Sequence, residues 1–219
     1  METAKNEQWI TIIIRVSGYS SILFVSLILF FLAREGFPAL GDVPFKDLFG
    51  TRWYPIEDYF GIWPLVFGSV LVTAGALLIG IPFGIGTAVY LSELAPAWIK
   101  NLLKPIIEIL AGLPSVVLGF LGIQVAIPFF RETFGLPTGL TAFTGAVLLG
   151  FISIPTIVSI AEDALNTVPA SYRHGALALG ANQWQTIWGV TIPSAKSGLL
   201  TAVMLGIGRT IGETMAVMM

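Results

Sequence analysis

The sequence predicts an all-α integral membrane protein, a polytopic bundle of transmembrane helices, and three observations lead to this fold class. Hydrophobic residues make up 55% of the 219 residues and charged residues only 11%. The mean hydropathy of +0.86 lies far above that of water-soluble domains. Several apolar runs reach the roughly 18 to 20 residues that cross about 30 Å of hydrocarbon as a helix. These runs lack the period of two that a barrel strand requires, so the spans are predicted to be helices.

The first predicted span covers Ile10–Ala33. Its apolar run is full length and lacks a small-residue cleavage site, which favours a retained helix over a removed signal peptide. A polar segment rich in Gly, Pro, Trp and acidic residues follows at 34–62. The second span, Pro64–Leu91, carries Pro82 close to two glycines, and this arrangement predicts a bend.

Three further spans are predicted in the rest of the chain. The third covers Pro105–Phe130 and contains a helix break at 112–115, and the fourth covers Gly139–Ile160. The fifth apolar run, Gly198–Met219, ends with the chain and has no polar tail behind it. We therefore expect a truncated chain, with a sixth span and a cytoplasmic tail missing.

Composition excludes several classes of function. The chain has no cysteine and one histidine, which argues against disulfides and against thiolate or histidine metal sites. Its net charge of −2 offers no basic field for nucleic acid. None of its lysines is preceded by glycine, so the loop that cradles ATP phosphates is missing. Placing the N-terminus in the cytoplasm puts six Lys and Arg inside and four outside, a weak preference for that orientation.

A polar stretch at 161–197 separates the fourth and fifth spans and has the pattern of two short helices joined by a tight turn. Pro169 suits the first turn of a helix, where its missing N–H has no helical partner anyway. Gly180 suits a C-terminal cap in the left-handed region. The pattern alone fits a hairpin lying on the membrane surface as well as a docking element.

The second short helix has a predicted start, an apolar stripe and a predicted end. Asn182 followed by Gln185 three residues later resembles a capping box. Pro193 is predicted to end the helix. The apolar stripe consists of Trp184, Ile187 and Trp188.

Arg209 and Glu213 interrupt the fifth apolar run. Its seven Leu, Ile and Val residues favour insertion by roughly 2 to 4 kcal/mol in total. An Arg and an acid near the centre of a span each oppose insertion by roughly 2.5 to 3.5 kcal/mol. The run must therefore pack its charged face against other helices or a wet cavity. A spacing of four residues places both groups on one helix face, where an ion pair can form.

The hairpin resembles the EAA motif of ABC importer permeases, the loop that docks on the ATPase subunit. Gly180, Val190, Ile192 and Pro193 stand at the motif's spacings, whereas His174 and Gly175 replace its opening Glu-Ala. The substitution removes the motif's carboxylate. The resemblance implies ATPase docking through these residues: Tyr172, Arg173, His174, Ala176, Leu179, Gly180 and Trp184.

Three further strings resemble the permease subunits of ABC phosphate importers, and the PstC type more than the PstA type. They are AVYLSELAP, PIIEILAGLPSVVLGFLG and GRTIGETMAVMM. The resemblance implies a type I, MetI-like permease core at 63–219, with the coupling loop at about 161–197, preceded by an N-terminal helix and outside loop at 1–62. It implies multiple spans in a bacterial or archaeal plasma (inner) membrane.

The resemblance also implies partners and a mechanism. The partners would be a PstA-like permease, a PstB-like ATPase dimer that uses ATP and Mg²⁺, a PstS-like phosphate-binding protein, phosphate and the lipid bilayer. The chain itself would be no enzyme and would bind no cofactor. The alternatives are a permease for molybdate or sulfate and a channel or secondary transporter not driven by ATP.

Two groups of residues are candidates for the substrate pathway. Arg209 is the favoured phosphate contact, because its planar fork donates two parallel hydrogen bonds to an oxyanion. Glu213 is expected to neutralise and orient Arg209, although a salt bridge that only locks helices remains open. Glu108, Pro114 and Ser115 are further pathway or gating candidates. The alternatives are an interfacial Glu108 beside water or Lys104, and a kink at Pro114 repaired by a serine hydroxyl.

Overall fold

The computed structural model describes residues 2–42 and 44–213. The chain divides into two compact units, Met1–Val66 and Phe67–Met219, and each is described by itself. Residues within each unit lie close to one another in space. The predicted domains 1–62 and 63–219 were drawn from sequence resemblance, and that boundary stays a prediction.

The first unit is dominated by α1 (Glu2–Asp42). A stretch of 30 residues in this helix, Trp9–Pro38, is apolar and long enough to cross a membrane, and none of its apolar window is buried. The predicted first span is therefore confirmed as a helix. The helix extends beyond Ile10–Ala33 because residues 2–9 contain Ala, Glu, Lys and Gln, which favour helix.

A small hairpin follows α1 in the predicted polar segment. It consists of α2 (Phe45–Leu48), β1 (Trp53–Tyr54), the 3₁₀ turn η1 (Pro55–Glu57) and β2 (Tyr59–Phe60). The two strands are antiparallel, with Trp53 opposite Phe60. These two rings meet edge to face with centroids 6.2 Å apart, a favourable arrangement for aromatic pairs.

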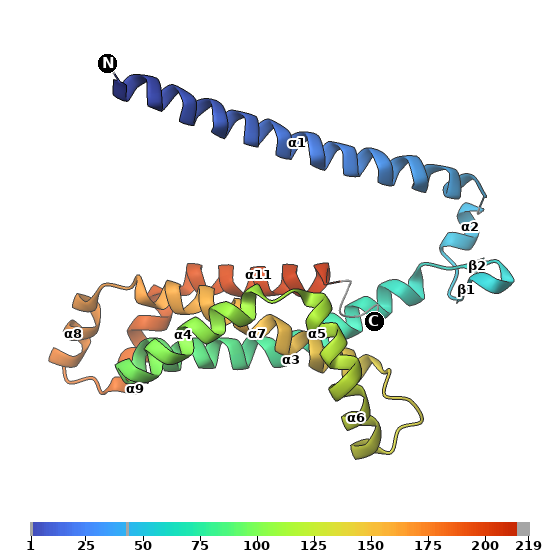
Figure 1. The fold of residues 1–219 in the computed structure, drawn as a ribbon. Coiled ribbons are helices and arrows are strands. Elements are labelled where there is room, and N and C mark those ends of the chain that lie inside the picture. Colours follow the sequence, from blue (N-terminus) through green and yellow to red (C-terminus); the bar gives the residue numbers. More distant parts are fainter. Residues whose placement is uncertain (1, 43, 214–219) are drawn as a thin grey trace. The chain divides into compact units, whose positions relative to one another are not determined.

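The second unit is entirely helical in the part that the structure describes (Figure 1). Its segments, counting α3 from its start in the first unit, are α3 (Trp63–Val89), the π-helical turn η2 (Tyr90–Leu94), α4 (Ala97–Gly112), α5 (Ser115–Leu121), the π-helical turn η3 (Gly122–Ala126), α6 (Ile127–Phe134), α7 (Ala142–Asn166), α8 (Ala170–Ala178), α9 (Gln183–Thr186), the π-helical turn η4 (Ile187–Thr191), α10 (Ile192–Ser194) and α11 (Lys196–Gly212).

Helix α7 forms the centre of this unit, and α3, α4 and α11 run alongside it (Figure 1). Ile157 of α7 is fully buried between two glycines of its neighbours. A Cβ on Gly84 of α3 would lie 2.7 Å from the Ile157 side chain, and a Cβ on Gly206 of α11 would lie 2.6 Å from it. These glycines allow close helix approach, as small residues do at membrane helix interfaces.

The predicted third span is wrong in its boundaries. The chain breaks at Leu113 and Pro114, where α4 ends and α5 begins. The stretch long and apolar enough to span is Ser115–Phe134, and α4 is a separate helix packed on α7. The reason is that Pro lacks an N–H donor and disfavours the helical conformation at the residue before it, and Leu113 is accordingly extended, with ψ 138°.

The second and fourth span predictions are confirmed with shifted ends. Helix α3 continues through Pro82, while the bend there remains a prediction. Helix α7 extends to Asn166, past the predicted end at Ile160, because its last turns are held by ion pairs rather than by lipid. The described part of the fifth run is α11, and its final residues, 214–219, lie outside the described residues.

Four helices within the described residues are long and apolar enough to cross a membrane. A fifth span arises if the helical stretch Gln183–Ser194 and α11 are counted together, although these are bent by 72° relative to each other. The predicted fold class, an all-α polytopic membrane protein, agrees with this arrangement.

Candidate functional site

The predicted helical hairpin forms as expected between α7 and α11. Helix α8 ends in a turn at Gly180, whose φ of +86° lies in the left-handed region that glycine accepts without strain. The capping box is present, since the Asn182 side chain accepts from the Gln185 N–H at 2.9 Å while the Gln185 side chain accepts from the Asn182 N–H at 2.8 Å. Both helix ends at the turn are therefore specified locally.

Two details of the hairpin differ from the sequence prediction. Pro169 is the N-cap of α8 rather than its first helical residue, which equally avoids the need for its missing N–H. Pro193 does not end the second helix, because the helical stretch continues to Ser194. The π-helical turn η4 immediately before it changes the hydrogen-bond pattern so that the proline is accommodated.

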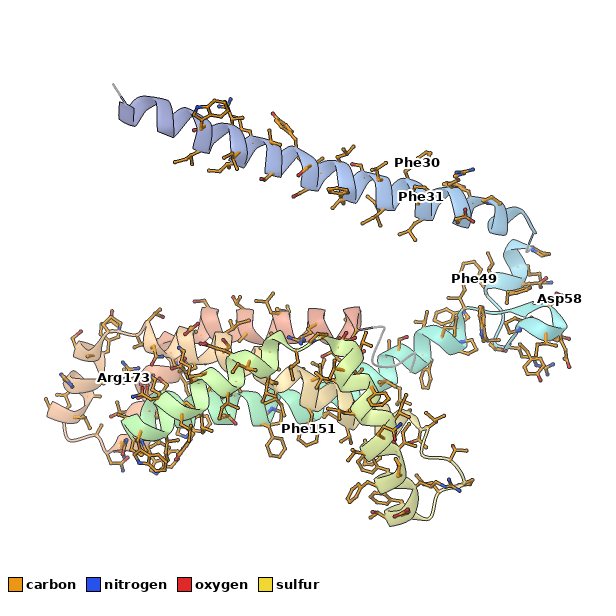
Figure 2. The ribbon with its side chains drawn as sticks, viewed as in Figure 1. Phe30, Phe31, Phe49, Asp58, Phe151 and Arg173 are labelled. Atoms are coloured by element: carbon orange, nitrogen blue, oxygen red, sulfur yellow. The ribbon has the colours of Figure 1, made fainter. Side chains whose placement is uncertain are left out.

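Arg173 of α8 holds the hairpin against the body of the unit (Figure 2). Its Nη2 donates to Glu93 Oε1 at 2.6 Å, and its Nε donates to both carboxylate oxygens at 3.1 Å. The Glu93 side chain is only 8% exposed. Such a bidentate, largely buried contact fixes geometry as well as charge. Arg173 was predicted as a docking residue, but its donors face inward.

The same arginine also closes the end of α7. Its two terminal nitrogens donate to the carbonyls of Leu165 at 2.9 Å and Val168 at 2.7 Å. Carbonyls at a helix C-terminus have no helical donor, and a cation there is favoured by the helix dipole. Gln183, in α9, donates to the Glu93 carbonyl at 3.1 Å. Both helices of the hairpin are thus tied to η2.

A second group of charges joins α4 to α7. Glu162 is 2% exposed, and its carboxylate pairs with Lys104 at 2.7 Å and with Lys100 at 3.0 Å. Asn166 donates to the same carboxylate at 2.6 Å. Ser92 donates to Asn166 at 3.2 Å and to Glu93 at 3.3 Å, which connects this group to Arg173. We call the whole set the carboxylate cluster: Ser92, Glu93, Lys100, Lys104, Glu162, Asn166 and Arg173.

Lys104 also pairs with the exposed Asp163 at 3.0 Å. Its hydrogen bonds to Glu162 and then Asp163 raise the pKa of Lys104 further above its usual range, so it stays charged at neutral pH. Glu108, which the sequence placed beside water or Lys104, is exposed. Lys104 instead turns towards Glu162 and Asp163, the partners that packing of α4 on α7 supplies.

The outer surface of the hairpin is apolar and exposed. Leu179, at the turn, is 91% exposed, and Trp188 of η4 is 67% exposed. The predicted docking residues Tyr172, His174, Gly180 and Trp184 are also exposed, and Ala176 is half-buried. Ile187, placed in the same apolar stripe by sequence, is 1% exposed and belongs to the core instead. The hairpin therefore exposes several large apolar side chains, while Arg173 and Ile187 hold it against the unit from the inner side.

Arg209 lies in α11, half-buried, where three helices meet. Its Nη1 donates to the carbonyl of Ala111 in α4 at 3.1 Å and to the hydroxyl of Thr156 in α7 at 2.5 Å. Both acceptors are neutral oxygens, which orient a guanidinium without cancelling its charge. We call this group, Arg209 with the Ala111 carbonyl and Thr156, the arginine site.

The helix break in the third apolar run creates one acceptor of the arginine site. Because the backbone becomes extended at Leu113, the carbonyl of Ala111 is among the last in α4 and has no helical donor. Arg209 supplies that donor from another helix. The structure thus brings the predicted break at Pro114 and Ser115 next to the predicted substrate contact, two features that lie far apart in the sequence.

The remaining predicted site residues take simple positions. Pro114 is the N-cap of α5 and Ser115 is its first residue. Glu213 follows α11 as its C-cap, with an extended backbone of φ −79° and ψ 101°. The predicted ion pair between Arg209 and Glu213, and the pathway roles of Glu108, Pro114 and Ser115, remain predictions.

The sequence prediction did not include several residues that the structure places in the carboxylate cluster and the arginine site. Lys100 and Lys104 are one helical turn apart, a spacing that predicts a shared partner on one face. The acidic pair Glu162 and Asp163 begins the polar stretch at 161–197, and could have been matched to them. Thr156 gave no sequence signal, because nothing local shows that Arg209 reaches it.

The chain is similar to known transport proteins. A family model described as "Binding-protein-dependent transport system inner membrane component" matches residues 80–219. "Probable ABC transporter permease protein YqgH" of Bacillus subtilis is 42% identical over 187 residues, which cover 84% of this chain and 60% of the relative.

Two relatives carry the name "Phosphate transport system permease protein PstC". The one from Haemophilus influenzae is 31% identical over 235 residues, covering 97% of this chain and 75% of the relative. The one from Mesorhizobium japonicum is 34% identical over 198 residues, covering 82% and 61%. The chain spans about 60% of the length of several curated relatives that it matches.

Among solved structures, the chain is similar to one from the inward-facing MetNI methionine ABC transporter. The TM-score is 0.54 at 24% sequence identity, over 69% of this chain and 68% of that chain. This likeness concerns the fold alone and agrees with the predicted MetI-like architecture. The family match over 80–219 shows that the chain belongs to the family of binding-protein-dependent transport system inner membrane components, with PstC-type permeases among its relatives.

Proposed function

We propose that this chain is the transmembrane, channel-forming subunit of an ATP-driven inorganic phosphate importer. The observation that carries the proposal is the similarity to permeases named for phosphate transport, which extends over 97% of the chain in one relative. The chain has no ATP-binding lysine loop in its sequence. In this proposal a separate subunit hydrolyses ATP, and this chain is no enzyme.

Arg209 is the proposed contact for the oxyanion. A guanidinium stays charged at physiological pH and binds an oxyanion through two parallel N–H groups. The two hydrogen bonds at the arginine site both use Nη1. A side-on contact with phosphate would use Nε and Nη2, which point along a different edge of the same plane. Glu213 is proposed to tune the charge and orientation of Arg209.

The hairpin is the proposed contact for the ATPase subunit. Its outer surface exposes Trp184 and Tyr172, aromatic side chains of the kind enriched in protein interfaces, beside the apolar Leu179. Its inner side is fixed to α7 and η2 by Arg173 and Gln183. Movement imposed on the hairpin by an ATPase dimer would therefore be passed to the helix bundle rather than absorbed by a loose loop.

The remaining partners follow from this assignment. They are a second, PstA-like permease, a PstB-like ATPase dimer that uses ATP and Mg²⁺, and a PstS-like binding protein that delivers phosphate. The chain is a multi-pass membrane protein by its helices and its family. We place it in the plasma or inner membrane of a bacterium or archaeon.

The decisive experiment is ATP-dependent uptake of labelled phosphate by membrane vesicles that contain the whole complex. We expect uptake that requires ATP and that excess sulfate or molybdate leaves within twofold of its starting rate. Strong competition by either oxyanion would instead assign the permease to that substrate. Uptake that continues without ATP would favour a channel or a secondary transporter.

Docking can be tested at the hairpin turn. Leu179→Glu places a charge on a side chain that is 91% exposed, so the fold should tolerate it. We expect this variant to lose co-purification of the ATPase from solubilised membranes. Leu140→Glu, at a position 70% exposed in the segment before α7, is the matched control and should retain the ATPase. Full ATPase recovery with Leu179→Glu and with deletion of Ser171–Trp188 would contradict the docking assignment.

A further inference from the structure

A proline lies close in sequence to each acceptor of the arginine site. Pro114 ends α4 and frees the Ala111 carbonyl. Pro155 lies inside α7, immediately before Thr156. The guanidinium of Arg209 thus contacts two neighbouring helices: α4 at the backbone break before Pro114, and α7 at the side chain that follows Pro155.

The hydroxyl of Thr156 is used differently from other hydroxyls nearby. The hydroxyl of Ser153 donates to the Gly150 carbonyl of its own helix at 2.8 Å, and that of Thr210 donates to the Gly206 carbonyl at 2.9 Å. Such bonds within a helix are the ordinary choice of Ser and Thr. Thr156 instead accepts a charge-assisted bond from Arg209 across two helices.

We propose that Thr156 is a positioning residue for the oxyanion contact of Arg209, and this inference rests on the proposed function. Two acceptors on a single nitrogen fix both the position of Nη1 and the plane of the guanidinium. The edge formed by Nε and Nη2 is then held in one direction before the anion arrives. Fixing a binding group in advance lowers the ordering cost of binding.

The same geometry explains why the Ala111 carbonyl alone is insufficient. One acceptor leaves the guanidinium free to rotate about the Nη1 contact, and Ala111 sits on α4, at the edge of the helix break. Thr156 sits on α7, the central helix of the unit. Thr156 therefore anchors the orientation of Arg209 to the central helix of the unit, whereas the Ala111 carbonyl alone would anchor it to a segment next to a break.

Thr156→Val tests this role, because valine keeps the shape of threonine and removes the hydroxyl. The assay is the initial rate of labelled phosphate uptake in vesicles with the whole complex, at a phosphate concentration well below saturation and at saturating ATP, because saturating phosphate would hide a loss of affinity. ATP hydrolysis and the amount of assembled complex are measured in parallel. We expect uptake to fall roughly tenfold, the equivalent of about 1.4 kcal/mol, because a hydrogen bond to a charged group is lost, with hydrolysis and assembly within twofold.

Two further variants separate positioning from packing. Thr156→Ser restores the hydroxyl and should restore uptake to within twofold. Thr210→Val removes a buried hydroxyl next to Arg209 whose hydrogen bond stays within α11, and should leave uptake unchanged. The inference fails if Thr156→Val transports normally, if uptake, hydrolysis and assembly all decline together, or if serine does not rescue.

Arg209→Gln in the same assay distinguishes failure of the inference from failure of the proposed function. If Arg209→Gln abolishes uptake while Thr156→Val transports normally, the positioning role alone is lost. If Arg209→Gln itself transports phosphate normally, the oxyanion assignment is wrong and the role of Thr156 is lost with it.

Discussion

The carboxylate cluster and the arginine site of the second unit each contain a part-buried arginine, but the two arginines have different kinds of hydrogen-bond acceptor. In the carboxylate cluster each cation meets a carboxylate, as in the contact of Arg173 with the largely buried Glu93. In the arginine site the hydrogen bonds of Arg209 go to a carbonyl and a hydroxyl. One arginine is fixed by opposite charge, and the other is aligned by neutral oxygens.

This difference in acceptors suggests different roles for the two sites, one in joining helices and one in binding an anion. A bidentate pair between an arginine and a carboxylate uses the directional donors of the guanidinium and offsets its charge, which suits a joint between helices. Hydrogen bonds to neutral acceptors fix the direction of a guanidinium without themselves offsetting its charge. We therefore expect damage to the carboxylate cluster to appear as lost stability, and damage to the arginine site as lost transport.

The largest expected effect is at the arginine site. Arg209→Gln removes the charge but keeps a polar side chain of similar reach, and we expect phosphate uptake to fall by about a hundredfold or more, since preorganised donors to an oxyanion are worth that much in other sites. Uptake is measured with the amount of assembled complex. Arg131→Gln, an exposed arginine of α6, is the control and should transport normally. Loss of assembly in Arg209→Gln would make this arginine a structural joint as well.

The next effect is at the centre of the carboxylate cluster. Glu162→Gln leaves two lysines facing a neutral amide in a site where the carboxylate is 3% exposed. Breaking a buried pair in this way destabilises by about 3 to 5 kcal/mol. We expect a lower melting temperature of the solubilised complex, and uptake that falls only as far as assembly falls.

Asp163→Asn is the matched control for that variant. Its side chain is 66% exposed and pairs with the same Lys104, so it should cost no more than about 1 kcal/mol. A Glu162→Gln complex that melts normally but does not transport would break the comparison, because it would place the carboxylate cluster in the transport path.

A smaller effect is expected at the base of the hairpin. Glu93→Gln weakens the contact with Arg173 but keeps an acceptor, and Arg173 retains its bonds to the carbonyls of Leu165 and Val168. We expect a loss of about 1.5 to 3 kcal/mol, the range for hydrogen bonds to charged groups. Protease cleavage within the hairpin should become faster. Glu132→Gln, which changes an exposed carboxylate of α6, should leave the cleavage rate unchanged. Equal cleavage in the two variants would argue against the hairpin anchor.

The smallest effect concerns pH. The pKa of Lys104 is raised by its carboxylate partners, so its stabilising contribution is fully present below the ordinary lysine value of 10.5 and is lost only as pH rises through the higher folded value. Between pH 7 and 9 we therefore expect no change in melting temperature from this group. Comparison of wild type with Lys104→Met across that range measures it, and a difference between the two curves that depends on pH would contradict the prediction.

The hairpin shows how far local sequence rules reach. Its turn at Gly180 and its capping box at Asn182 were predicted correctly, because both depend on residues within a few positions of each other. The inward direction of Arg173 was not predicted, because its partner Glu93 lies 80 residues away in the chain. The break at Pro114 was predicted as well, but the bounds of the third span were wrong, since hydropathy did not show that α4 before the break packs on α7 while the apolar stretch Ser115–Phe134 follows it.

The sequence by itself determined the membrane location, the helical class, most of the spans and the hairpin, and it singled out Arg209 as a candidate for the substrate pathway. Each of these follows from composition, from hydropathy along a single segment or from the cost of one charge in an apolar run. Only the tertiary structure decided which groups meet, such as Lys104 with Glu162 and Arg209 with Thr156. The physical reason is that hydrogen bonds and ion pairs act over a few ångströms, and helix packing alone brings distant segments that close.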